Sequence, residues 1–151
     1  GMKQIQVRSQ QRLYPVISRE VRKAAIILMD ELLQTDAYDL NILFVNETRM
    51  AKINLEHLRH EGATDIITFD YTTPTLLHGD LIICPPVANE NAARYRVSLG
   101  REIARNIIHG VLHLLGYDDS ELIVRKKMKR AENRLLQKLA RRFPIDSLAH
   151  G

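Results

Sequence analysis

The chain has 151 residues, the size of one domain rather than two. Hydrophobic residues make up 45% and charged residues 26%, and the single cysteine, Cys84, excludes an internal disulfide framework and a multi-cysteine zinc module. No apolar run approaches the roughly 20 residues that cross a bilayer, and no secretory signal is visible. We therefore expect a single domain over residues 1–151, a cytoplasmic location and no membrane partner. Gly1, before Met2, is interpreted as a remnant of tag removal.

Positive charge is concentrated toward the carboxyl end of the chain. Residues 120–142 hold nine Lys or Arg against two Glu, so this segment carries +7 while the rest sums to −3, for a net charge of +4. Such an asymmetry suggests a polyanionic partner, and nucleic acid is the usual one. The alternative is a solvated helix face whose cations stabilise the helix C-terminus.

The first half of the chain alternates between strand and helix patterns. Alternating residues predict a half-buried strand over 3–8, and helical spacing of apolar residues predicts a helix over 19–34 with Ser18 as its N-cap. A nearly continuous apolar run predicts a buried strand over 38–45. A helix capped by Thr48 is then expected to run to about Leu58.

Two further strands and a helix follow. Alternating β-branched and aromatic residues predict a strand over 65–71, and an apolar run after a Pro-containing loop predicts another over 80–84. The pair Pro85-Pro86 breaks that strand and can start a helix over 87–95.

Two helices close the chain. Ser98 is expected to cap a helix over 99–115, with Gly116 at its C-terminus, and Ser120 to cap a last helix to about Phe143. Strands come early and helices late, with helices between the first three strands. This order predicts an α+β fold with one mixed sheet of about four strands, partly parallel, covered by about five helices.

The segment 109–119 (HGVLHLLGYDD) carries the most chemistry. His109 and His113 are four residues apart on a predicted helix, so they lie about 40° apart on one face and can reach one metal ion. Gly116 would turn the chain, and Asp119 could then return as a third ligand. Two histidines and a carboxylate around an open fourth position are typical of a catalytic zinc site. Asp118 is the alternative ligand, or a hydrogen-bond partner of an imidazole.

The ordinary alternative for such a pair is two partly buried histidines with satisfied hydrogen bonds. Because the surrounding residues are Ile, Val and Leu, where unpaired polar groups are costly, the metal interpretation is favoured. Gly110 occupies the position at which the HExxH motif of zinc peptidases carries its glutamate base. Glycine cannot move a proton, although it lets a bulky substrate approach the backbone closely. Peptide hydrolysis by the HExxH route is therefore disfavoured.

These residues also carry a family resemblance. The segment 109–119 resembles the signature H-G-x-L-H-L-x-G-Y-D-H of the YbeY family of bacterial endoribonucleases. Upstream, 64–69 (TDIITF) resembles the family's T-D-V-L-S-F strand, and 79–83 (GDLII) resembles its G-D-I-x-I strand. The residues 53–54 followed by Arg59 resemble its L-N-x-x-x-R helix. The matches occur in family order over about residues 40–135.

The resemblance implies a single-strand-specific, metal-dependent endoribonuclease that acts in ribosomal RNA (16S) maturation and ribosome quality control. It implies one zinc ion on His109, His113 and Asp119, where this chain has Asp in place of the family's usual third histidine. Arg59 would hold the scissile phosphate, so Arg59, His109 and His113 are the expected catalytic residues. The alternative for Arg59 is a surface arginine at a helix end.

The expected RNA-binding residues are Arg59 together with three cations of the last helix, Lys126, Lys127 and Arg130. The expected partners are single-stranded or ribosomal RNA and the ribosome or its proteins. A second hypothesis is a non-catalytic ribosome-associated factor that binds RNA and holds a structural metal. A third, a metalloprotease, is disfavoured by Gly110.

Overall fold

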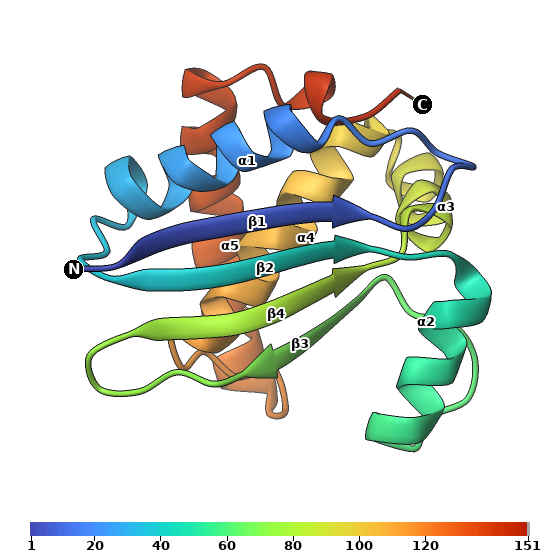
Figure 1. Cartoon of the computed structure of the whole chain (residues 1–151), viewed down its shortest axis with the longest axis horizontal. Helices are drawn as coiled ribbons and strands as arrows, with labels where there is room; N and C mark the ends of the chain where they lie inside the picture. Colours follow the sequence, from blue (N-terminus) through green and yellow to red (C-terminus); the bar gives the residue numbers. More distant parts are fainter. Residues whose placement is uncertain (151) are drawn as a thin grey trace.

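The computed structural model describes residues 1–150, which form one four-stranded sheet with helices packed on it (Figure 1). The strand order is β1-β2-β4-β3. The central pairs are parallel, between β1 (Lys3–Ser9), β2 (Tyr38–Phe44) and β4 (Leu77–Ile83), and β3 (Ile66–Asp70) runs antiparallel to β4 at one edge. The predicted α+β class with one mixed sheet is confirmed.

Five α-helices are found in residues 1–150, in the predicted order. Their bounds are α1 Ser18–Ile26, α2 Glu47–Ile53, α3 Pro85–Tyr95, α4 Leu99–Leu114 and α5 Leu122–Arg142. Two π-helical segments extend the first two helices, η1 (Ile27–Leu32) after α1 and η2 (Asn54–Leu58) after α2. A short 3₁₀ helix, η3 (Ile145–Leu148), was not predicted.

The main hydrophobic core lies between the sheet and the helices α1, α4 and α5, with α4 and α5 behind the sheet in Figure 1. Every second residue of β2 is buried toward it, from Tyr38 to Phe44. The intervening residues, such as Asp39 and Asn41, are only partly buried on the opposite face. The strand predicted as buried over 38–45 is β2, which has no exposed residue but is fully buried on one face only. A smaller core packs α2 against the sheet around Met50 and Ile82.

The helix starts show which caps the sequence predicts reliably. The Ser98 hydroxyl accepts a hydrogen bond from the backbone N–H of Arg101 at 3.0 Å, as predicted for the start of α4. The cap of α2 is Asn46 rather than Thr48, because the Asn46 side chain accepts from the N–H of Arg49 at 2.8 Å.

Two other predicted caps are wrong. The residue before α1 is Ile17 and that before α5 is Glu121, each without a capping side-chain hydrogen bond. Ser120 precedes Glu121 by one residue, and its hydroxyl donates to the Asp118 carboxylate at 2.6 Å instead of capping α5. Strand β4 also begins at Leu77, three residues before the predicted start, because Leu77 pairs with Tyr38 of β2.

The position of α4 depends on Gly110. This glycine is buried against the sheet, and a Cβ atom there would lie 2.6 Å from Leu81 Cδ2 and 3.1 Å from Ile66 Cδ1. The space at Gly110 is thus filled by side chains of β3 and β4, so the expectation that a substrate approaches the backbone here is wrong. Gly110 instead lets α4 lie close to the sheet, and this packing sets how far His109 and His113 lie from the sheet.

Candidate metal centre

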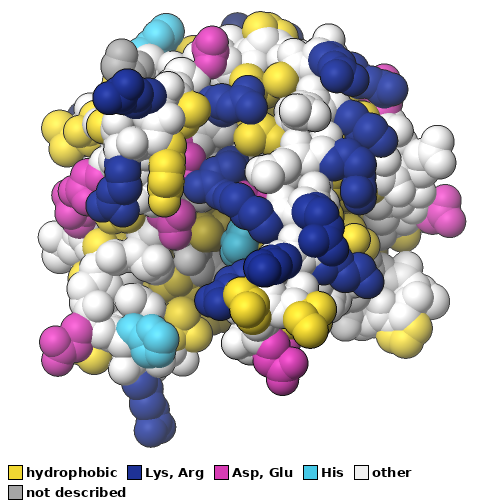
Figure 2. Space-filling view, turned by 180° about the vertical axis from the view of Figure 1, so that it is seen from behind, with side chains coloured by type: hydrophobic (Ala, Val, Ile, Leu, Met, Phe, Trp, Pro, Cys, Tyr) yellow, Lys and Arg dark blue, Asp and Glu magenta, His cyan; other side chains and the backbone are white. Residues whose placement is uncertain are grey.

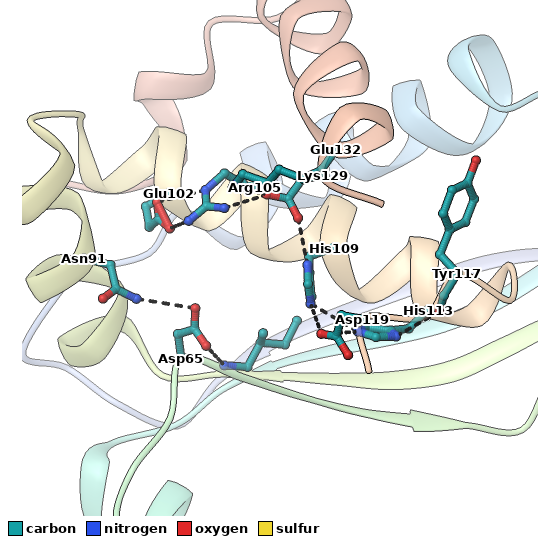
Figure 3. A network of polar contacts seen from close by, with 11 residues as sticks. Asp65, Asn91, Glu102, Arg105, His109, His113, Tyr117, Asp119, Lys129 and Glu132 are labelled. Carbon is teal, nitrogen blue, oxygen red and sulfur yellow. Dashed lines mark hydrogen bonds and ion pairs between the residues drawn. The ribbon is translucent and has the colours of Figure 1, made fainter. Parts of the chain in front are cut away.

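His109 and His113 project from one face of α4, and their rings converge. The two Nε2 atoms are 3.1 Å apart, and each side chain is 28% exposed. Gly116 follows the helix with φ of +97°, which turns the chain so that Asp119 returns to the histidines. One Asp119 carboxylate oxygen lies 3.7 Å from His109 Nε2 and 3.5 Å from His113 Nε2. The sequence prediction that these three side chains meet agrees with the structure (Figure 3).

The other nitrogen of each ring is already engaged. His109 Nδ1 donates to Glu132 Oε2 at 2.7 Å, and His113 Nδ1 donates to the backbone carbonyl of Tyr117 at 3.2 Å. These outward bonds place the ring protons on Nδ1. Both Nε2 lone pairs and the Asp119 carboxylate therefore point toward one position between the three side chains.

This donor set fits a divalent cation. Two lone pairs that face each other at 3.1 Å repel unless a cation or proton lies between them. Around a tetrahedral zinc with bonds of about 2.0–2.1 Å, ligand atoms are separated by roughly 3.3–3.4 Å. The separations of 3.1, 3.5 and 3.7 Å between His109, His113 and Asp119 bracket that value. Imidazole nitrogen and carboxylate oxygen are also ligands that zinc accepts, so these three residues could bind a metal.

Behind His109 lies a buried charged network (Figure 3). Glu132 of α5 is 2% exposed and accepts from both His109 and Arg105, the latter at 2.5 Å. Arg105 also bonds Glu102, which is 1% exposed, at 2.5 Å. Burial alone would raise the pKa of Glu132, but the hydrogen bonds from His109 and Arg105 lower that pKa to about 2. Glu132 is thus a permanent carboxylate that fixes the His109 ring.

Sequence reasoning missed Glu132 and Arg105. A signal was present, because Glu132 lies at helical spacing among Met128, Ala131 and Leu135 on the apolar face of α5. A single carboxylate on a buried helix face needs a buried donor. Identifying that donor, however, requires knowing that α5 packs across α4 at His109.

The three side chains open onto a cavity of about 480 Å³. It is walled on the other side by the loop before β3 and by β3 itself, with Leu58, Thr64, Asp65, Ile66, Ile67, Thr68 and Asp70 as the other lining residues. Asp65 is engaged in the wall, because it accepts from the N–H of Ile66 at 2.9 Å and from Asn91 at 3.4 Å. His109, His113 and Asp119, which we call the metal group, therefore lie at the wall of an open cavity rather than inside a closed one.

Arg59 and Asp118, two other candidates from the sequence, lie outside the metal group. Arg59 follows η2 in the left-handed conformation, with φ of +56°, and is exposed. Its neighbour Leu58 lines the cavity, but Arg59 is not among the lining residues. Asp118 accepts from both the N–H and the hydroxyl of Ser120, which lowers its pKa. Its carboxylate is thus used in the turn after α4.

The candidate RNA-binding cations are exposed on α5. Lys126, Lys127 and Arg130 all face solvent near the first turns of this helix, and Lys127 lies beside the loop at Tyr117 and Asp118. Figure 2 shows Lys and Arg side chains gathered around a hollow on this face, with histidine visible between them. Lys127 therefore lies beside the turn that returns Asp119 to the two histidines. No helix in residues 1–150 is both long and apolar enough to cross a membrane.

Comparison with known proteins places this arrangement in a family. The family model described as endoribonuclease YbeY matches residues 4–140. This chain belongs to the YbeY family. Among curated YbeY endoribonucleases, it is 37% identical to that of Azobacteroides pseudotrichonymphae over 83% of this chain and 91% of the relative. It is 34% identical to that of Parabacteroides distasonis over 81% and 86%.

A solved structure supports the fold of this YbeY family member. The solution structure of TM1509 from Thermotoga maritima matches with a TM-score of 0.67, covering 89% of this chain and 88% of that one. The two sequences are 22% identical, so this likeness bears on the fold alone.

Proposed function

We propose that this chain is a metal-dependent endoribonuclease that cuts single-stranded RNA, with one zinc ion held by His109, His113 and Asp119. The observation that carries the proposal is the convergence of two imidazole Nε2 atoms and a carboxylate oxygen at the wall of an open cavity. Membership of the YbeY endoribonuclease family supports RNA as the substrate. A bound divalent ion would supply Lewis acidity toward a phosphate oxygen and lower the pKa of a water molecule.

Each residue of the site has a distinct part in this proposal. His109 and His113 present Nε2 to the ion because their Nδ1 protons are held by Glu132 and the Tyr117 carbonyl. Asp119 supplies the third ligand and the negative charge. Arg59 would reach the scissile phosphate from the end of η2, where its planar guanidinium can form two hydrogen bonds to phosphate oxygens.

The exposed cations of α5 would bind the RNA backbone. Lys126, Lys127 and Arg130 are exposed near the start of α5, and Lys127 lies beside Tyr117 and Asp118 in the turn before Asp119. Contacts to phosphates position a strand without reading its sequence. We further propose that the substrate is ribosomal RNA and that the chain acts on 16S maturation and ribosome quality control in the cytoplasm, in contact with the ribosome.

A peptidase that uses a glutamate at position 110 is incompatible with the packing. The space next to Gly110 is filled by Leu81, Ile66 and Thr68, so even a Cβ atom there would collide. The side of α4 that carries position 110 faces the sheet rather than the cavity. Gly110 is thus a packing residue, and the general base of the HExxH mechanism has no place here.

Cleavage of a labelled single-stranded RNA tests the proposal. We expect the wild type to cut, a chelator to stop cleavage and zinc to restore it. His113→Ala, purified in parallel, should neither cut nor bind zinc, which separates the enzyme from contaminating ribonucleases. Thermal unfolding of the variant without metal should stay cooperative, because His113 lies at the cavity wall.

Three results would contradict the proposal. Equal cleavage by the wild type and His113→Ala would mean that the activity does not come from this site. No cleavage by the zinc-loaded wild type, together with retained RNA binding, would instead favour the non-catalytic ribosome-associated factor. Full zinc occupancy in His113→Ala would overturn the assignment of the ligands.

A further inference from the structure

Four side chains at i, i+4 spacing form a row along α4: Arg101, Arg105, His109 and His113. Four residues of α-helix advance about 6 Å along the axis. The two histidines open onto the cavity of the metal centre, whereas both arginines line a second pocket of about 360 Å³ nearer the start of α4. The row therefore leads from the metal centre into another pocket, which we call the Tyr95 pocket.

The Tyr95 pocket is built by three helices. Its lining residues are Tyr95 and Val97 at and after the end of α3, Arg101, Glu102 and Arg105 of α4, and Lys129, Asn133 and Leu136 of α5. The two acidic side chains nearby, Glu102 and Glu132, are almost fully buried: Arg105 contacts both, and Lys129, whose side chain is 54% exposed, donates to Glu132 at 3.2 Å. Within residues 1–150, Arg101 has no carboxylate within ion-pair distance. The carboxylates are thus buried and contacted by Arg105 and Lys129, while Arg101 and the exposed part of Lys129 give the pocket its positive charge.

Tyr95 gives the pocket an aromatic surface. Tyr95 is 60% exposed, and the Arg105 guanidinium carbon lies 5.9 Å from the centroid of its ring. Arg105 is itself fixed by two buried carboxylates, so the ring rests against a rigid partner. The pocket that contains this exposed ring is lined by cations as well as by the apolar side chains of Val97 and Leu136. An aromatic ring next to cations is the arrangement with which proteins stack nucleobases and bind the adjoining phosphates.

We propose that the Tyr95 pocket is a nucleotide subsite for the RNA strand whose scissile phosphate lies at the metal centre. This inference rests on the proposed function and adds a substrate-binding site to it. A base stacks on the free face of Tyr95, Arg101 and Lys129 bind the adjoining phosphates, and the Asn133 amide faces the base edge. The strand then follows the row of α4 from His109 past Arg105. A polyanion without bases would use the cations but gain nothing from Tyr95, and this difference is open to test.

Binding of a fluorescein-labelled single-stranded RNA, followed by anisotropy in EDTA so that the RNA stays intact, tests the subsite. We expect Tyr95→Ala to weaken binding at least about fivefold and Tyr95→Phe to restore most of it, because stacking needs the ring and not the hydroxyl. Arg101→Gln should weaken binding and reduce its dependence on salt. Tyr71→Ala is the matched control, since Tyr71 is 51% exposed but lies next to His78 by the β3–β4 loop. The affinity of Tyr71→Ala for the RNA should equal that of the wild type.

A second measurement uses the zinc-loaded protein and separates this inference from the proposed function. With RNA cleavage as the readout, the Tyr95→Ala effect should fall mainly on KM. If the wild type binds RNA and Tyr95→Ala weakens binding, but no zinc-loaded protein cuts, the subsite stands and the nuclease assignment fails. If cleavage is normal and Tyr95→Ala binds as tightly as the wild type, the subsite is wrong. Equal weakening of RNA and inorganic polyphosphate binding by Tyr95→Ala would also overturn it, because stacking cannot act on polyphosphate.

Discussion

Two buried carboxylates of similar exposure allow the support of His109 to be separated from the stability of the fold. Glu132 accepts hydrogen bonds from His109, Arg105 and the partly exposed Lys129, whereas Glu102 accepts from Arg105 alone. They are 2% and 1% exposed. Glu132→Gln therefore removes the negative charge next to His109, Arg105 and Lys129, and Glu102→Gln removes the one next to Arg105 only. The two variants are matched in chemistry and burial.

The two variants are expected to differ in zinc affinity but to lose similar amounts of unfolding free energy. Losing the partner behind a metal-ligating histidine weakens metal binding about 10–100-fold, or about 1.4–2.8 kcal/mol. We expect this loss for Glu132→Gln and less than about a twofold change for Glu102→Gln. Breaking a buried ion pair costs about 3–5 kcal/mol of unfolding free energy. Because Arg105 is 23% exposed and keeps one carboxylate, we expect about 2–3 kcal/mol for each variant.

Competition with a fluorescent zinc chelator at neutral pH measures the affinity, and urea unfolding of the metal-free proteins measures the stability. The account predicts that both variants lose stability and that Glu132→Gln alone loses affinity. Equal zinc affinities in Glu132→Gln and Glu102→Gln would contradict this prediction, because they would show that the negative charge of Glu132 behind His109 does not help to hold the metal.

Three further predictions concern single positions. Gly110→Ala should destabilise the metal-free protein by about 1–3 kcal/mol in urea unfolding, because its Cβ would lie 2.6 Å from Leu81; an unchanged midpoint would contradict the close packing of α4. Asp119→Ala should lower zinc affinity at least about tenfold in chelator competition, and Asp118→Ala by much less, since Asp118 bonds Ser120; the reverse order would exchange the two roles. Burial raises the pKa of the Cys84 thiol to about 11, so a thiol reagent at pH 8 should label Cys84 only after unfolding, and rapid labelling of the folded chain would show that β4 opens.

Local patterns made the helices and the histidine pair predictable. The i, i+4 spacing of His109 and His113 fixes their common face once a helix is assumed, and Gly116 signals the turn that returns Asp119. The strands were also predictable, from alternation over 3–8 and 65–71 and from apolar runs over 38–45 and 80–84. The different burial of the two faces of β2 was not predictable, because it depends on where the helices lie.

The partners of the site depend on contacts that no local pattern contains. Glu132 meets His109 across 23 residues of sequence, through the packing of α5 on α4. Tyr95 meets Arg105 only because α3 ends beside α4. Arg59 illustrates the opposite case, in which a motif suggested a role while the structure places the residue at an exposed left-handed position outside the lining of the cavity.

The most direct test of the central claim is a crystal structure of the zinc-loaded protein, with diffraction measured on both sides of the zinc absorption edge. The account predicts one anomalous peak about 2.0–2.2 Å from His109 Nε2, His113 Nε2 and an Asp119 carboxylate oxygen, with the fourth position open to the cavity. An anomalous peak away from these residues would contradict the assignment of the metal centre. A fourth protein ligand that closes the site would contradict the catalytic role.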